Sequence, residues 1–257
     1  MSGEEQDERE AFRSALKAHL DGFATRGQTI SLWWRDDDAI EPTPALDRML
    51  ALANRYGVDI GLAVIPKGAG EALAERLRQE PHAVVLQHGW RHKNHQIKAE
   101  GEKAAELGTR RDMDEVLGEL TMGREKLEGL FGEKFIPALV PPWNRISDAI
   151  AQAAPGIGLP GLSTFTSKVA MRPHRLQTHL DPIKWKENGR FIGWGSARRR
   201  FDEILEARSQ APSEPIGLLS HHLVMDDDHF AFFEDVLEIT AAHPAAKWPP
   251  VRRLFAL

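Results

Sequence analysis

The sequence contains no cysteine, and this absence excludes several kinds of chemistry at once. Without a thiol, the chain cannot form a disulfide, use a thiolate nucleophile or bind zinc through sulfur. Any metal site must therefore be built from histidine, aspartate or glutamate. Basic charge is not in excess either, because the net charge is −5. We therefore expect no basic surface of the kind that binds nucleic acid.

Long hydrophobic runs are also missing. No apolar stretch approaches the roughly 20 residues that cross a bilayer as a helix. Residues 1–10 are mainly acidic and lack the apolar core of a signal peptide. These features predict a cytoplasmic protein without a transmembrane segment, and they leave its oligomeric state open.

The chain does contain an alternation of strand-like and helix-like segments along its 257 residues. The apolar runs that predict buried strands are 29–34, 58–65, 83–86, 135–140, 161–165, 191–194 and 216–219. Segments with helical spacing of apolar residues lie between most of these runs. Such alternation predicts an α/β fold with a mainly parallel sheet, either closed as a barrel or open. No glycine-rich phosphate-binding motif follows the first predicted strand, which argues against nucleotide binding.

Two histidines four residues apart, His88 and His92, follow the third predicted strand. In parallel α/β folds, functional side chains gather at the carboxyl ends of the strands. Imidazole is the commonest nitrogen ligand of metal ions, and two of them on one turn can face the same ion. The pair therefore predicts a metal site, with loop histidines of no ligand role as the alternative.

Three adjacent carboxylates, Asp36, Asp37 and Asp38, follow the first predicted strand. Neighbouring negative charges repel one another unless a cation, an arginine or a proton compensates them. A metal ion shared with the histidine pair would supply that positive charge. The alternative is a helix N-terminus with aspartates at its cap and first turn, because Pro44 and helical spacing follow shortly.

Two more motifs stand at predicted strand ends. Pro141-Pro142-Trp143 follows a middle strand, and Leu219-Ser220-His221-His222 closes a late one. Successive side chains of a strand point to opposite faces, so only one of the two histidines can face a site. The Leu-x-His spacing favours His221 and leaves His222 for a supporting or substrate contact.

Together these motifs resemble the ordered motifs of the polysaccharide deacetylase family, also called the NodB-homology or carbohydrate esterase family four domain. The matching residues extend from Asp36 to His221, most of the chain. The resemblance implies a distorted (β/α) barrel that removes N-acetyl groups from amino sugars with one divalent metal ion. We therefore expect a single barrel domain of this type over residues 29–257, with residues 1–28 as a helical extension packed on it.

The resemblance also implies roles for individual residues. The family's T-F-D-D-G motif falls on residues 34–38, which makes Asp36 the general base and Asp37 a metal ligand. Its H-[ST]-x-x-H motif falls on residues 88–92, which makes His88 and His92 the other two ligands. The Leu-x-His motif makes His221 the general acid. The implied ion is zinc, with cobalt, nickel or manganese as alternatives.

Other implied roles concern substrate contacts. The backbone N–H of Trp143 is expected to stabilise the oxyanion, and Leu219 and Trp185 are expected to form an apolar wall for the acetyl methyl group. A D-x-x-x-W element of the family is similar to Asp181–Trp185, although Lys184 stands where an acid is expected.

Two further positions depart from the family pattern. Gly89 replaces the hydroxyl residue of the histidine motif, so an accessory hydrogen bond is lost. Val140 replaces the arginine that orients the base, and either Arg35 or Arg145 could supply a guanidinium in its place.

Three hypotheses about function follow. The first is a metal-dependent deacetylase that acts on an amino sugar in an oligosaccharide, a polysaccharide or a precursor of one. The second is a hydrolase of a non-sugar amide, such as a cyclic ureide or imide, on the same fold, because a fold does not determine a substrate. The third is a catalytically degenerate member that only binds glycans, in which the departures mark lost catalysis.

Overall fold

The computed structural model describes residues 3–166, 173–211 and 213–257. The described helices are α1 (Gly3–Thr25), α2 (Pro44–Tyr56), α3 (Glu71–Arg78), α4 (Met113–Phe131), α5 (Asp148–Ala153), α6 (Trp194–Gln210), α7 (Asp227–Ala242) and α8 (Val251–Phe255). The described strands are β1 (Ile30–Ala39), β2 (Ile60–Val64), β3 (Ala83–His88), β4 (Phe135–Val140), β5 (Gly161–Leu162), β6 (Ile183–Lys184), β7 (Arg190–Phe191), β8 (Ile216–Ser220) and β9 (Ala246–Lys247).

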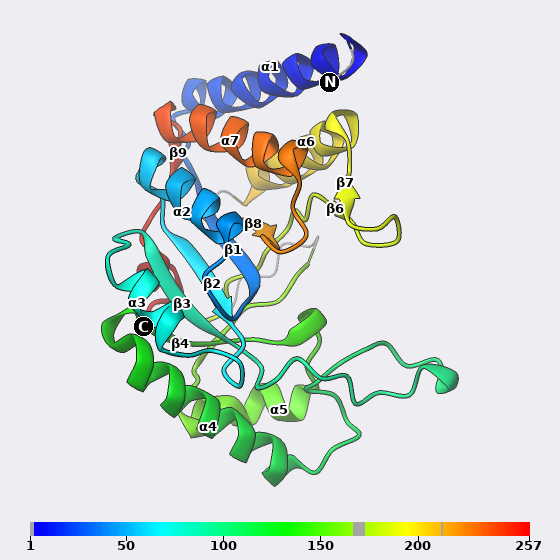
Figure 1. The fold of residues 1–257 in the computed structure, drawn as a ribbon. Coiled ribbons are helices and arrows are strands. Elements are labelled where there is room, and N and C mark those ends of the chain that lie inside the picture. Colours follow the sequence, from blue (N-terminus) through cyan, green and yellow to red (C-terminus); the bar gives the residue numbers. More distant parts are fainter. Residues whose placement is uncertain (1–2, 167–172, 212) are drawn as a thin grey trace.

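One parallel sheet forms the centre of the molecule. Its strands are ordered β5-β4-β3-β2-β1-β8, and β9 pairs with the start of β1. Single bridges from Arg175 to Leu162 and from Leu180 to Leu218 connect residues 174–180 to both edges of the sheet. The sheet therefore curves into the distorted (β/α) barrel that the sequence predicts, with helices on its outer surface (Figure 1).

The two faces of β1 have different surroundings. Trp33 belongs to an apolar cluster inside the barrel and contacts Phe255 of α8, edge to face. Trp34 points the other way and stacks on Phe233 of α7 at a ring distance of 5.1 Å. Because side chains alternate along a strand, odd-numbered residues of β1 face the barrel interior and even-numbered residues face the helices. This alternation determines where the following aspartates point.

Helix α1 lies across α6 and α7 on one side of the sheet, while α4 and α5 cover the opposite side (Figure 1). Four apolar side chains, Phe12, Leu16, Leu20 and Phe23, are at most 2% exposed in α1. The division of the chain into a helical extension and a barrel domain stays a prediction.

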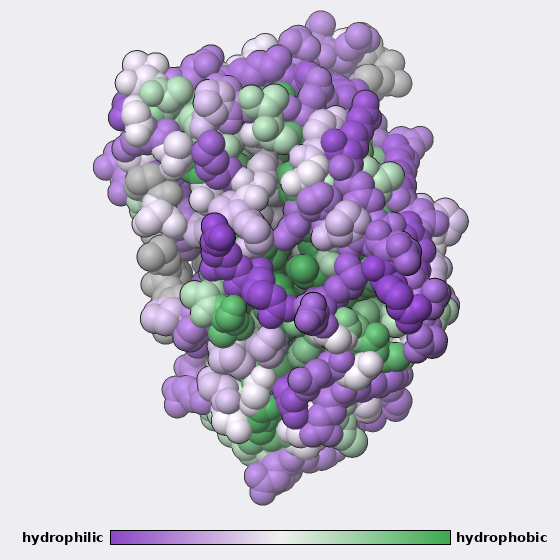
Figure 2. Space-filling view, turned by 90° about the vertical axis from the view of Figure 1, so that its left-hand side faces the viewer, coloured by the Kyte–Doolittle hydropathy of each residue, from purple (hydrophilic) through white to green (hydrophobic). Residues whose placement is uncertain are grey.

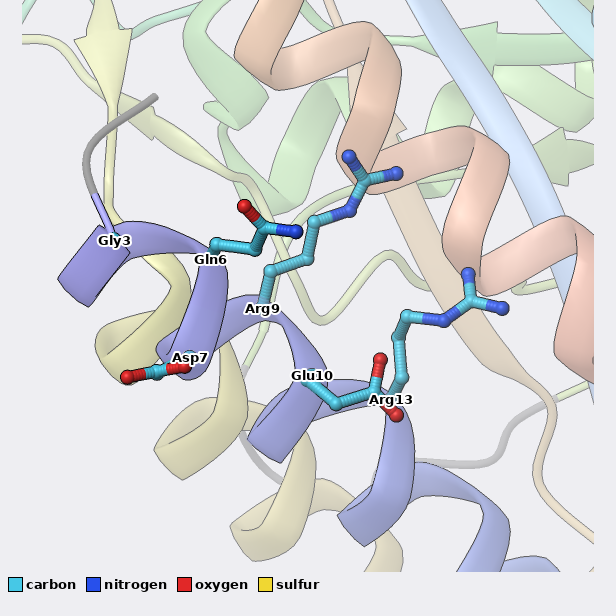
Figure 3. Close-up of a pocket in the computed structure, with 6 residues that line it drawn as sticks. All are labelled: Gly3, Gln6, Asp7, Arg9, Glu10 and Arg13. Atoms are coloured by element: carbon cyan, nitrogen blue, oxygen red, sulfur yellow. The ribbon is translucent and has the colours of Figure 1, made fainter.

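The first turns of α1 line an open groove, shown in Figure 3. Arg9 and Arg13 extend from this helix toward α7 (Figure 3). Nε of Arg9 lies 2.6 Å from the buried carboxylate of Asp235, which Arg13 also contacts. The charged groups of the groove thus help to dock α1.

One predicted strand is wrong. Only the first residue of the segment 191–194 is extended, as the last residue of β7, which pairs antiparallel with β6 outside the barrel, and α6 begins at Trp194. Gly193 has a φ of 84°, which ends the extended backbone at that point. Trp194, Ala197 and Phe201 are then buried with helical spacing.

No described helix is long and apolar enough to cross a bilayer. On the molecular face that lies at the left of Figure 1, apolar side chains form small groups between hydrophilic ones (Figure 2). Isolated apolar groups of this kind are normal on protein surfaces and carry no functional assignment.

Candidate active site

Three side chains converge at the carboxyl edge of the barrel: Asp38, His88 and His92. Oδ1 of Asp38 lies 3.1 Å from Nε2 of His88 and 3.3 Å from Nε2 of His92. His88 comes from the end of β3 and is buried, whereas Asp38 and His92 are partly exposed. One ligand atom from each residue lies within 4.8 Å of the other two, which is close enough for one ion to contact all three.

The hydrogen bond of His88 shows why this group suits a cation. Nδ1 of His88 lies 2.9 Å from the carbonyl oxygen of Val140. A carbonyl only accepts hydrogen bonds, so Nδ1 is the donor and a neutral His88 directs the lone pair of Nε2 toward Asp38. Two acceptors 3.1 Å apart require a positive charge between them, either a proton or a metal ion.

Electrostatics point to the same requirement. Burial disfavours the charged imidazole of His88, but the carboxylates of Asp37 and Asp38 outweigh it and raise its pKa. Burial also opposes ionisation of Asp38, yet its hydrogen bond to His88 and the charges of His88, His92 and His221 lower its pKa. Burial and the neighbouring His88 together lower the pKa of His92. The site thus favours an ionised carboxylate beside imidazoles.

The aspartate beside the histidines differs from the one predicted. The sequence predicts Asp37 there, but the structure brings Asp38 to the pair. In the pairing of β1 with β2, Asp36 lies opposite Leu62 and Ala39 opposite Val64, so β1 contains one extra residue. This bulge, with a φ of 74° at Asp38, interrupts the alternation of side chains. The carboxylate of Asp38 consequently turns toward the histidines.

Asp37 instead pairs with Arg35 inside the barrel. Its Oδ1 lies 2.8 Å from Nε of Arg35, and its Oδ2 lies 3.0 Å from Nη2. Arg35 is fully buried, and it also donates to Ser163 Oγ at 2.7 Å and to Asn144 Oδ1 at 2.6 Å. The guanidinium is therefore held on three sides and presents a fixed partner to Asp37.

The structure places one of the two candidate arginines, Arg35, at the site. Arg145 is exposed, and its guanidinium donates to the carbonyl of Ala104. Of the two arginines that the sequence suggests, only Arg35 reaches the aspartate cluster. It reaches the cluster from β1, whereas Val140 stands at the end of β4.

Asp36 does not suit the role of general base that the sequence predicts. It is fully buried on the helix side of β1, and its Oδ1 accepts from Ser220 Oγ at 2.7 Å and from the N–H of His222 at 2.9 Å. Its Oδ2 lies 2.6 Å from Nδ1 of His222. Although burial opposes protonation of His222, the charge of Asp36 raises the pKa of that imidazole. Because Asp36 faces the helices and not the barrel interior that holds Asp37 and His221, it is poorly placed to take a proton from a water molecule at the site.

The two late histidines follow the end of β8 and point to opposite sides, as the alternation of side chains predicts. His222 faces Asp36, while Nε2 of His221 lies 3.9 Å from Oδ2 of Asp37. Trp185 meets the His221 ring edge to face at 4.6 Å. His221 is thus the histidine beside the inward-facing aspartate.

Asp181 supports this corner of the site. Its Oδ2 accepts a hydrogen bond from Nε1 of Trp185 at 2.8 Å, and its Oδ1 accepts from the N–H of Ile183 at 3.0 Å. Burial raises the pKa of Asp181, although the charge of His221 opposes this. The nearby Lys184 pairs with the exposed Glu187 at 3.4 Å.

The remaining predicted contacts also lie near the site. Trp143 has a φ of 55°, and its ring lies 4.2 Å from the ring of His92. Leu219 is 1% exposed in β8, and His221 follows two residues later, just past the end of that strand, so the alternation of side chains places both on one side. Trp185 is 53% exposed.

Several residues of the site were not predicted from the sequence: Asp38 as the partner of the histidines, Asn144 and Ser163 as partners of Arg35, Ser220 as a partner of Asp36, and Glu106 beneath the histidine loop. Most of these residues lie far in sequence from the groups that they contact, so no local pattern marks them. Gly89 could have pointed to Glu106, because a glycine within a metal-binding motif can indicate that another group lies very close to the backbone there.

No protein-family model matches the sequence, and no curated protein matches it either. Solved structures do match. A candidate polysaccharide deacetylase from Mycobacterium smegmatis superposes with a TM-score of 0.66 at 14% identity, covering 90% of this chain and 90% of that chain. A family 4 acetyl xylan esterase from Clostridium thermocellum, in complex with a cobalt ion, gives 0.54 at 11% identity, covering 88% and 90%.

A third match bears on the possibility of lost activity. It is a mutant of a pseudoenzyme of carbohydrate esterase family 4 with restored activity, at a TM-score of 0.56 and 15% identity, covering 89% of this chain and 68% of that chain. The fold of this chain is therefore that of the family 4 polysaccharide deacetylases, as the motifs predict. Which reaction the chain performs must be argued from its own residues.

Proposed function

We propose that this chain is a metal-dependent deacetylase that hydrolyses the N-acetyl group of an amino sugar in an oligosaccharide, a polysaccharide or a precursor of one. One observation carries the proposal: Asp38, His88 and His92 converge beside a second aspartate, Asp37, which faces His221. A metal-binding group, a base and an acid at one edge are the parts that amide hydrolysis needs. The fold that this chain shares with deacetylases and esterases supports the proposed activity.

Asp38, His88 and His92 would hold the ion. When bound, a divalent ion supplies a Lewis acid that polarises the acetyl carbonyl and lowers the pKa of a water molecule toward neutrality. Two imidazoles and one carboxylate are typical of catalytic zinc sites, and cobalt, nickel and manganese accept the same ligands.

Asp37 takes the place of Asp36 as the proposed general base. Its pairing with the buried guanidinium of Arg35 fixes the carboxylate and leaves it beside His221 at the mouth of the barrel. In this role Asp37 removes a proton from the attacking water. The resulting assignment moves both aspartate roles one residue along the chain, to Asp37 and Asp38.

His221 is the proposed general acid. An amine is a poor leaving group unless its nitrogen is protonated as the C–N bond breaks. The His221 ring lies between Asp37 and Trp185, and Asp181 holds the indole of Trp185 by a hydrogen bond. These contacts orient His221 toward a substrate in the same space as Asp37.

The backbone N–H of Trp143 is the proposed donor to the tetrahedral oxyanion, because the left-handed backbone at Trp143 brings this loop against His92. Leu219 and Trp185 are the proposed wall for the acetyl methyl group. The half-exposed indole of Trp185 also offers an apolar surface for a sugar ring.

The other two hypotheses receive less support. Hydrolysis of a cyclic amide would need the same metal and acid–base groups, and no observed contact favours it. A pure glycan-binding protein would not need the base, the acid and the three converging ligands together. The departure at Val140 does not mark lost catalysis, because Arg35 supplies the guanidinium.

Acetate release tests the proposal. N-acetylglucosamine oligomers, acetylated xylan and a panel of cyclic amides are incubated with protein loaded with zinc, cobalt or nickel, and with the Asp37→Asn variant as the inactive control. We expect acetate from the N-acetylglucosamine oligomers and little from the variant. Release from xylan alone would identify an esterase, and ring opening without acetate would favour the cyclic amide hypothesis. Metal-loaded protein that hydrolyses none of these substrates would overturn the proposal.

A further inference from the structure

The loop between β3 and α4 begins at the histidine motif and projects far from the barrel before it returns (Figure 1). Its returning end carries Glu106, which is 0% exposed. A carboxylate buried this completely is costly unless hydrogen bonds satisfy it. Its partners therefore indicate what it does.

Those partners are consecutive backbone N–H groups of the histidine motif. Glu106 Oε2 accepts from Trp90 at 3.1 Å and from His92 at 3.3 Å, and Oε1 accepts from Arg91 at 2.9 Å. Successive N–H groups that point at one anion form a nest, and hydrogen bonds to a carboxylate are stronger than neutral ones. The carboxylate thus holds the backbone that carries His92, whose own φ is 54°.

Gly89 makes room for this carboxylate. A Cβ at residue 89 would lie 2.1 Å from Oε2 of Glu106 and 2.8 Å from Cδ of Pro142. The φ of Gly89 is also 55°, a conformation that favours glycine. No side chain fits at residue 89 while Glu106 and Pro142 hold their positions.

We propose that Glu106 is a positioning residue of the metal site: it holds residues 90–92 so that Nε2 of His92 faces Asp38. The glycine at residue 89, where a hydroxyl residue is usual, is then explained because the Glu106 carboxylate fills that space. This inference rests on the proposed role of His92 as a metal ligand.

Zinc affinity tests the proposal. The dissociation constant is measured by competition with a chromophoric chelator for the wild type and for Glu106→Gln and Glu106→Ala. Loss of a partner that orients a ligand typically weakens metal binding about 10- to 100-fold. We expect about that loss for Glu106→Ala and a smaller loss for Glu106→Gln, which keeps one acceptor oxygen.

Glu102→Gln is the matched control. Glu102 lies in the same loop and accepts a hydrogen bond from the N–H of Ile97 at 2.9 Å, but it does not contact the histidine motif. We expect its zinc affinity to stay within about twofold of the wild type. Circular dichroism and urea unfolding identify a variant that fails to fold, in which case Glu106→Gln decides.

The outcomes separate this inference from the proposed activity. Folded Glu106 variants that bind zinc as tightly as the wild type would overturn the positioning role. An equal loss in Glu102→Gln would also overturn it, because the effect would then belong to the loop as a whole. Zinc binding without acetate release would contradict only the activity, and a wild type that binds no zinc would contradict both.

Discussion

The carboxylate of Asp36 and the imidazole of His222 form a buried pair, with 2.6 Å between Oδ2 and Nδ1. Asp36 also accepts hydrogen bonds from Ser220 Oγ and from the N–H of His222, the residues on either side of His221. One side chain of β1 therefore anchors the strand end that carries the proposed general acid. Its neighbour, Asp37, points into the barrel and is the proposed base.

This relationship predicts different effects for neighbouring substitutions. Asp37→Asn should lower kcat by about 10²- to 10⁴-fold, the usual contribution of general acid–base catalysis, and retain the metal. Asp36→Asn should lower kcat less, because it disturbs the position of His221 without removing a proton acceptor. Steady-state kinetics and metal content of both variants check this order. A larger loss in Asp36→Asn would return the base to the residue that the sequence first suggests.

Arg35 should be important for stability as well as for the geometry of the site. Replacing it by methionine leaves the buried Asp37 without its ion-pair partner, and removal of one partner from a buried ion pair typically costs about 3–5 kcal/mol. Urea unfolding measures this loss in the free energy of unfolding. Arg145→Met is the control, since an exposed substitution usually changes stability by about 0.5 kcal/mol or less. Equal stability of the two variants would contradict the role of the pair.

His179 should make the protein less stable in mild acid. It is buried beside Arg208, and burial together with the positive charge of Arg208 lowers its pKa to about 3. Between about pH 6.5 and pH 3, the unfolded chain therefore binds a proton that the folded chain does not. The free energy of unfolding consequently falls as the pH decreases through this window.

The expected slope is up to about 1.4 kcal/mol per pH unit for one proton. Urea unfolding between pH 7 and pH 5 measures it, and His179→Gln should flatten the curve relative to the wild type. A variant with the same pH dependence as the wild type would show that His179 does not cause it.

Helix α1 should be required for a stable fold. Deleting residues 1–25 removes four large apolar side chains, each at most 2% exposed, and burial of such a side chain contributes about 1.5–3 kcal/mol. We expect the free energy of unfolding to fall by roughly 6 kcal/mol or more. Thermal unfolding of the shortened chain checks this. An unchanged Tm would show that α1 is a separable extension.

Much of the fold could be predicted from the sequence because apolar runs mark most strands of the central sheet locally and helical spacing marks several of the helices. The histidine pair was predicted in the same way, since both residues lie on one turn after a buried strand. The structure brings Asp38 to the histidine pair, one residue later than the Asp37 that the sequence predicts there. Residues 32–34 are apolar on both faces of β1, so no alternation indicates which side faces the barrel.

The bulge after Asp36 could not be predicted because it arises from the pairing of β1 with β2. The partners of Arg35 and the contact of Glu106 with the histidine motif also join residues distant in sequence. The opposite directions of His221 and His222 after β8 were predicted, because the alternation of side chains depends only on the local geometry of extended backbone.

Metal binding by single-aspartate variants tests most directly whether Asp38, His88 and His92 form the metal site. Wild-type protein, Asp38→Ala and Asp37→Ala are loaded with zinc, dialysed and analysed for zinc per chain by mass spectrometry. We expect about one ion per chain in the wild type, retention in Asp37→Ala and loss in Asp38→Ala. Zinc lost from Asp37→Ala but kept by Asp38→Ala, or absent from the wild type, would contradict the site described for this chain.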